Sequence, residues 1–251
     1  MRTPSFRLDG KRALVVGASS GIGQACAIAL GEYGASVQVV ARRIAALNET
    51  VQAIQALGGH ASATALDITD IAQTEGWIAD HGPFDILINA AGTARHSAAL
   101  ETSEADFDVV VDLNFKSAYF VTRAVAKGLI EANKTGSLIT ISSQMAKIGG
   151  IDRAVYSASK HAIEGMTKSM AIEWGKHGIR INTICPTFIR TALTAPTFEN
   201  PERVQWINQK IKLGRAGEVQ DIMGTAVFLA SDASALITGT ALMVDGGWTA
   251  G

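Results

Sequence analysis

Cysteine is scarce in this sequence, and that scarcity bears on where the protein works. The two cysteines, Cys26 and Cys185, fall in separate predicted elements and have no metal-ligand spacing. We therefore expect no metal site. Both cysteines are expected to be small buried hydrophobic side chains in a reducing cytoplasm.

Long apolar runs and an excess of one charge are also missing. No run of about 18 apolar residues is available to span a bilayer, and the polar start, residues 1–12, lacks the apolar segment of a signal peptide. Lysine and arginine number 22 against 23 acids, with no long basic run. We therefore expect a cytoplasmic protein with neither nucleic acid nor a membrane as its partner.

Short apolar runs alternate with helical patterns along all 251 residues. This order predicts a single α/β domain, residues 1–251, with a Rossmann fold: a doubly wound, seven-stranded parallel sheet with helices on both faces. Strands are expected at 12–16, 36–41, 60–66, 84–88, 137–142, 179–184 and 240–244. Helices are expected at 22–33, 44–57, 102–131, 152–174 and 219–230.

A glycine-rich turn, residues 17–23, joins the first strand to the first helix. Glycine permits positive φ and close backbone approach, and the free N–H groups at a helix N-terminus favour phosphate. Glycine also serves purely local turns, but the strand–turn–helix context favours a nucleotide site. The expected contacts to the cofactor are Gly17, Ser19, Ser20, Gly21, Ile22 and Gly23.

The end of the second strand bears on the choice of cofactor. Enzymes that use NAD usually place an acid here to hold the ribose 2′-hydroxyl, whereas a 2′-phosphate requires cations. This chain has Arg42 and Arg43 instead, which favours NADP(H) over NAD(H). The alternative is that both arginines are solvated. After the third strand, Asp67, followed by Ile68, could accept a hydrogen bond from the adenine amine.

The fourth strand runs into Asn89, Ala90, Ala91 and Gly92. Three small residues there would let a flat ring or a sugar lie against the backbone, although the segment could also be a simple glycine turn. We assign Asn89, Ala91 and Gly92 to the cofactor site. His96 follows in a polar loop with no partner in view, so it is expected on the surface.

Tyr156 and Lys160 lie four residues apart in a predicted helix, so a phenol and an ammonium would share one volume. A neighbouring cation favours the phenolate, so Lys160 could bring the Tyr156 pKa toward the working pH. Ser143, at the end of the fifth strand, could hydrogen-bond a substrate oxygen. By itself the pair could equally be a surface tyrosine stacked on a lysine stem.

Two further segments are assigned. Asn114 is a poor helix former inside the predicted helix 102–131, where its amide is either a packed polar group or a kink that holds a water near Lys160. Residues 187–217 are irregular, with a short helical pattern around 203–211, and we expect them to form a substrate lid. The glycine turn, residues 89–92, Ser143 and Pro186 are all expected just past strand ends, which lie at one edge of a parallel sheet.

These motifs together resemble the short-chain dehydrogenase/reductase family over essentially the whole chain, in particular members of the 3-oxoacyl-[acyl-carrier-protein] reductase type. The residues that carry the resemblance are Gly17-x-x-x-Gly21-x-Gly23, Asn89-x-Ala91-Gly92, Asn114, Ser143 and Tyr156-x-x-x-Lys160. Val16, Ala90 and Thr187 depart from the usual pattern, and Ser20 stands where many NADP-using relatives carry a cation.

The resemblance implies a role for each catalytic position. Tyr156 would be the general acid in reduction and the base in oxidation. Lys160 would lower the Tyr156 pKa and hold the nicotinamide ribose, Ser143 would orient the substrate oxygen, and Asn114 would anchor the water of a proton relay. The family also implies a homotetramer, and it implies that the nicotinamide carboxamide and the diphosphate contact Pro186, Ile189 and Thr191.

The activity expected first is NADPH-dependent, reversible reduction of a ketone or 3-oxo group to a secondary alcohol. The alternative is an NAD(P)-dependent sugar or polyol dehydrogenase of the gluconate 5-dehydrogenase type. A non-catalytic dinucleotide-binding sensor is a remote third possibility, since Ser143, Tyr156 and Lys160 are all present. The lid offers Phe188, Leu193, Phe198 and Trp206 with few cations nearby, which disfavours a multiply charged substrate.

Overall fold

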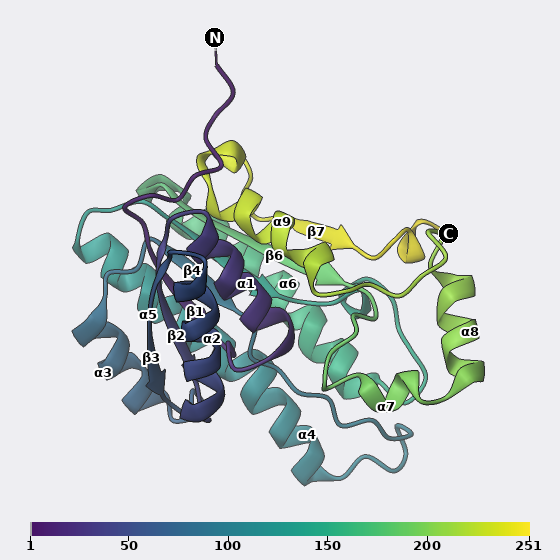
Figure 1. The fold of residues 1–251 in the computed structure, drawn as a ribbon. Helices are drawn as coiled ribbons and strands as arrows, with labels where there is room; N and C mark the ends of the chain where they lie inside the picture. Colours follow the sequence, from purple (N-terminus) through teal and green to yellow (C-terminus); the bar gives the residue numbers. More distant parts are fainter. Residues whose placement is uncertain (1) are drawn as a thin grey trace.

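A computed structural model describes residues 2–251, and one parallel sheet organises them (Figure 1). Its strand order is β3-β2-β1-β4-β5-β6-β7, with all neighbours parallel, which confirms the predicted doubly wound Rossmann-like sheet. The strands are β1 (Arg12–Val16), β2 (Ser36–Ala41), β3 (His60–Ala65), β4 (Ile86–Asn89), β5 (Gly136–Ile141), β6 (Ile179–Pro186) and β7 (Ala241–Val244).

Side chains alternate between two hydrophobic cores, one on each face of the sheet. In β1, Ala13 and Val15 enter one core, and Leu14 and Val16 enter the other, as the two-residue period of a strand requires. The first core is covered by α1 (Gly21–Glu32), α2 (Ile44–Ala56) and α9 (Gln220–Ala230). The second is covered by α3 (Ile71–His81), α5 (Ser117–Glu131) and α6 (Ala154–Trp174). Burial on both faces explains why the strands are continuous apolar runs.

Helix α3 was not predicted. It begins at Asp70, whose side chain accepts a hydrogen bond from the Gln73 N–H at 3.0 Å. Only Thr74 and Ile78 are buried, and Gly76 interrupts its apolar pattern. An N-cap and contact with α5, rather than an amphipathic stripe, therefore define this helix.

The single helix predicted over 102–131 is divided in the structure. Helix α4 (Glu104–Val111) passes into a π-helical segment, Asp112–Lys116, before α5 begins. Asn114 lies in this segment, is 1% exposed and bonds to residues outside the helix. The amide is therefore both packed and placed where the helical ladder is disturbed.

The segment from 187 to 217 is more ordered than predicted. It contains α7 (Ala195–Phe198) and α8 (Pro201–Lys210), and α8 lies below the C-terminus in Figure 1. A small core of their own joins α8 to the end of the chain through Ile207, Ile211, Ala216 and Trp248. Within residues 2–251, no helix is long and apolar enough to cross a membrane.

Candidate active site

A cleft of about 1070 Å³ lies at the carboxyl ends of the strands, where the strand order reverses between β1 and β4. Of the predicted site residues, Asn89 and Asn114 do not line the cleft; both lie directly behind it. The others line it: Gly17, Ser19, Ser20, Gly21, Ile22, Gly23, Arg42, Arg43, Asp67, Ile68, Ala91, Gly92, Ser143, Tyr156, Lys160, Pro186, Ile189 and Thr191.

The glycine turn is packed against the segment that follows β4. Gly17 has φ +78°, and a Cβ on it would lie 2.7 Å from the Ala91 nitrogen. A Cβ on Gly23 would collide with the Gly17 carbonyl oxygen. Ser20, at the N-cap of α1, makes no side-chain capping bond, so no hydroxyl competes for the first N–H groups of that helix. This arrangement fits a phosphate-bearing cofactor lying against backbone.

Two exposed cations lie beside the glycine turn. Arg43 Nη2 donates to Ser19 Oγ at 3.4 Å, and neither Arg42 nor Arg43 pairs with a carboxylate within the described residues. Hydrogen bonds from Thr69 lower the pKa of Asp67, and the charge of Arg42 lowers it further. Both arginines are therefore free to meet an anionic group at this end of the cleft.

Tyr156 and Lys160 share one face of α6, as predicted. Lys160 Nζ donates to the Ile141 carbonyl at 2.9 Å and lies 5.7 Å from the centre of the Tyr156 ring. Burial lowers the pKa of Lys160 to about 8. Burial also raises the pKa of Tyr156, against which the Ser143 hydrogen bond and the charge of Arg153 act. That Lys160 itself lowers the Tyr156 pKa stays a prediction.

The side chain of Asn114 connects the loop after β4 to α6 through hydrogen bonds. Its Oδ1 accepts from the Thr93 N–H at 2.8 Å, and its Nδ2 donates to the Thr93 carbonyl at 2.9 Å and to Ser159 Oγ at 3.2 Å. A Cβ on Gly92 would reach Asn114 Oδ1 at 3.4 Å and Lys160 Nζ at 3.8 Å. The amide thus holds Gly92 close to Lys160.

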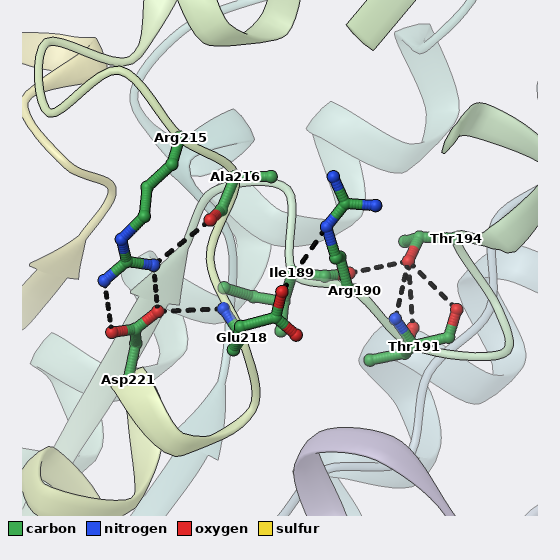
Figure 2. A network of polar contacts seen from close by, with 8 residues as sticks. All are labelled: Ile189, Arg190, Thr191, Thr194, Arg215, Ala216, Glu218 and Asp221. Atoms are coloured by element: carbon green, nitrogen blue, oxygen red, sulfur yellow. Dashed lines mark hydrogen bonds and ion pairs between the residues drawn. The ribbon is translucent and has the colours of Figure 1, made fainter. Parts of the chain in front are cut away.

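The start of the segment 187–217 is fixed to the residues that lead into α9, as Figure 2 shows. Arg215 forms a bidentate ion pair with Asp221: Nη1 donates to Oδ2 at 2.6 Å, and Nη2 donates to Oδ1 at 2.8 Å. This arginine and a hydrogen bond from the Glu218 N–H lower the pKa of Asp221 to about 2. Glu218 in turn pairs with Arg190 at 3.4 Å, and Thr194 Oγ1 donates to the Ile189 carbonyl at 2.6 Å.

Comparison with known proteins identifies the family. A family model described as enoyl-(acyl carrier protein) reductase matches residues 17–249, which is most of the chain and includes every predicted catalytic position. The chain belongs to the short-chain dehydrogenase/reductase family. It is an NAD(P)-dependent oxidoreductase that acts on CH–OH groups.

Relatives of this short-chain dehydrogenase are named for sugar acids and polyols. A 2-dehydro-3-deoxy-D-gluconate 5-dehydrogenase from Dickeya dadantii is 39% identical over 250 residues, 98% of each chain. A D-threitol dehydrogenase from Mycolicibacterium smegmatis is 39% identical over 97% of this chain and 95% of its own. A candidate 2-deoxy-D-gluconate 3-dehydrogenase from Agrobacterium tumefaciens, crystallised with bound NADP, has a TM-score of 0.95 and 41% identity over 100% of both chains.

Sequence reasoning missed two cleft residues of this short-chain dehydrogenase. His96, expected on the surface without a partner, lies 2.6 Å from Arg153 Nη1 through its Nε2, and its ring stands edge-on to Tyr156 at 6.1 Å. The two partners are 57 positions apart, so no local pattern joins them. The position of Arg153, about one helical turn before the predicted catalytic residue Tyr156, is the one signal that pointed to it.

Proposed function

We propose that this short-chain dehydrogenase interconverts a secondary alcohol and a ketone on a sugar acid or polyol, with NADP(H) as its cofactor. The observation that carries this proposal is the full-length similarity to the two dehydrogenases of such substrates at 39% identity, combined with Ser143, Tyr156 and Lys160 in one cleft. These relatives favour the sugar and polyol alternative over the 3-oxoacyl or simple ketone substrate that the sequence suggested first.

Tyr156 handles the proton in the proposed reaction. In the oxidative direction its phenolate accepts the proton of the substrate hydroxyl, and in the reductive direction its hydroxyl returns the proton to the carbonyl oxygen. Ser143 Oγ, fixed by the Met145 N–H at 3.1 Å, lies at the end of β5, where it can hydrogen-bond the same substrate oxygen. Lys160 supports the phenolate by its charge, and Asn114 anchors a water on the proton path.

The nicotinamide cofactor supplies a hydride donor or acceptor when it is bound. The glycine turn would hold its diphosphate, Asn89 to Gly92 its nicotinamide ribose, and Asp67 and Ile68 its adenine. Pro186, Ile189 and Thr191 would hold the nicotinamide and diphosphate from the lid side. The preference for NADP(H) rests on Arg42 and Arg43, which carry no carboxylate partner among residues 2–251, and is supported by the relative crystallised with NADP.

Three expectations from the sequence belong to this proposal. Residues 1–251 act as one catalytic domain, and residues 187–217 close over the substrate as a lid. The enzyme is a homotetramer, in which the small residues of α6 allow close helix contact. The buried, unpaired thiols of Cys26 and Cys185 are compatible with a reducing cytoplasm.

Initial rates test the proposal directly. NADP+ and NAD+ are compared with gluconate, threitol and xylitol, and NADPH and NADH with a keto-sugar acid, a ketose and a 3-oxoacyl thioester. We expect turnover of at least one sugar acid or polyol pair, with a higher kcat/KM for the phosphorylated cofactor. Turnover restricted to the thioester would overturn the substrate class, and a preference for NADH would overturn the assignment of Arg42 and Arg43.

A further inference from the structure

One positive charge at the substrate end of the cleft has no acidic partner. Arg153 caps α6 three residues before Tyr156, lines the cleft, and makes no ion pair with any described residue. Arg95, which also lines the cleft, differs because it pairs with Asp106 at 3.6 Å, and Arg190, which lies outside the cleft lining, pairs with Glu218 at 3.4 Å. Arg153 is therefore a cation without an ion-pair contact beside the phenol of Tyr156.

Arg153 is also partly removed from water. Its guanidinium carbon lies 5.5 Å from the centre of the Phe188 ring, on the lid side of the cleft. Burial lowers its pKa, as does the charge of Arg203, while Tyr156 and Asp152 act in the opposite direction. A guanidinium stays protonated under these conditions, so the charge is held where its hydration is reduced and a second cation is close.

His96 fixes the direction of this guanidinium. Burial, together with the charges of Arg153 and Arg203, lowers the pKa of His96 to about 4, so the imidazole is neutral at physiological pH. A neutral ring has one acceptor nitrogen, and Nε2 accepts from Arg153 Nη1 at 2.6 Å. The remaining N–H groups of Arg153 have no protein hydrogen-bond partner in the described chain. Several donors on one charged plane are thus left for a ligand.

We propose that Arg153 binds the carboxylate of the substrate and that His96 is its positioning residue. A carboxylate accepts two parallel hydrogen bonds from a guanidinium and supplies the missing negative charge. Arg153 is one helical turn from Tyr156. When the substrate carboxylate binds Arg153, a carbon farther along the substrate's carbon chain therefore lies at the Tyr156 hydroxyl. The inference rests on the proposed function and narrows its substrate to an open-chain hydroxy monocarboxylate, that is, a sugar acid rather than a neutral polyol or ketose.

A matched pair of substrates tests the site: an aldonate that the rate measurements identify, and its amide, which has the same carbon chain without the charge. For the wild-type enzyme we expect kcat/KM to favour the carboxylate about 10–100-fold, the range of one charged hydrogen-bonded pair. Arg153→Gln should remove most of this ratio by raising KM for the carboxylate, with the amide little affected. Arg153→Lys should retain part of it.

Two controls separate binding from general damage. Arg95→Gln removes a charge from the same cleft, but one already paired with Asp106, and should keep the wild-type ratio. His96→Gln retains a hydrogen-bond acceptor and should keep the preference, whereas His96→Phe should raise KM for the carboxylate and not for the amide. Equal NADPH affinity and melting temperature in all variants show that the fold is intact.

The outcomes of these experiments test the carboxylate site separately from the proposed function. An unchanged carboxylate-to-amide ratio in Arg153→Gln, or neutral polyols used as well as sugar acids by the wild type, overturns the carboxylate site and leaves the proposed function standing. If no sugar acid, polyol or ketose is turned over, the proposed function is wrong. Calorimetric titration of gluconate into the NADP-loaded protein then decides the site: binding lost in Arg153→Gln supports it, and no binding to the wild type overturns it.

Discussion

At the end of the cleft proposed for the cofactor, two backbone segments pack directly against each other, whereas the end proposed for the substrate is built from side-chain contacts. The first end is made by the turn at 17–23 and the segment 89–92, which touch so closely that Gly17 admits no Cβ. The second end is made by His96, Arg153 and Phe188, which come from three separate segments. A backbone surface can accept the same cofactor in many enzymes, while side chains can be exchanged to change the substrate.

The largest effect on activity is expected at Tyr156, which lies between the cofactor end and the substrate end of the cleft. Tyr156→Phe removes the hydroxyl that exchanges the proton and should lower kcat about 10²–10⁴-fold. The ring remains, so its contact with His96 and the binding of both ligands should be preserved. Stopped-flow and steady-state rates measure the loss, and fluorescence titration measures NADPH binding. Tyr33→Phe, an exposed tyrosine at the end of α1, is the control and should match the wild type. A fully active Tyr156→Phe enzyme contradicts the assignment.

Adding one methyl group to the glycine turn should disturb its packing at the cofactor end of the cleft and leave the substrate end unchanged. Gly17→Ala combines a left-handed φ with a Cβ 2.7 Å from Ala91 N, and we expect it to lower the free energy of unfolding by about 2–4 kcal/mol and to weaken NADPH binding. Gly58→Ala has nearly the same φ, +81°, but no atom within 4 Å, and should cost only about 1 kcal/mol. Urea unfolding with and without NADP+ measures both. Equal losses would mean that the close approach is unimportant.

Removing the charges of Arg42 and Arg43 tests the point at the cofactor end where side chains are proposed to select between NADPH and NADH. The double change Arg42→Ala, Arg43→Ala should weaken NADPH about 10–100-fold and NADH little, since only the former carries the 2′-phosphate. Isothermal titration with the two cofactors gives both affinities. The same loss for both would show that the arginines do not read the phosphate.

The smallest effect is expected at the base of the lid. The depressed pKa of Asp221, about 2, means that its carboxylate adds stability above its unfolded pKa near 4, and that this stability is lost as the pH falls through about 2. Because the side chain is 32% exposed, we expect Asp221→Asn to cost about 1 kcal/mol at pH 7.

Urea unfolding of wild type and Asp221→Asn at pH 7 and pH 3 tests this linkage. The difference between them should be smaller at pH 3 than at pH 7. Asp106→Asn, at an exposed carboxylate 3.6 Å from Arg95, is the control and should change stability less. A difference that does not depend on pH contradicts the electrostatic role of Asp221.

The elements around the proposed cofactor site could be predicted from the sequence, because their features are local; that these residues bind the cofactor stays a prediction. Strands β1 and β2 begin and end where predicted, since each is a buried apolar run, and the glycines after β1 have one structural use. Helix α3 was missed because it buries only Thr74 and Ile78. The π-helical segment was not predictable in detail, because the bonds of Asn114 to Thr93 and Ser159 join residues 21 and 45 positions apart.

The substrate end could be predicted less well, because its contacts join residues that are far apart in the sequence. Arg153 and His96 meet only after the sheet has brought the loop after β4 beside α6. The lid was expected to be irregular because its helices are short. Its order depends on Trp248, whose ring lies 5.2 Å from that of Trp206 and 5.6 Å from that of Phe188.

That dependence on Trp248 has a consequence for synthesis on the ribosome. Strands β1 to β5, which carry the glycine turn and residues 89–92, are complete by residue 141, more than a hundred residues before Trp248 is added. The small core beneath the lid, by contrast, needs Ile207 and Ile211 to meet Trp248. The nascent protein can therefore pair these five strands while it is still being translated, but the small core beneath residues 187–217 closes only after Trp248 has left the exit tunnel.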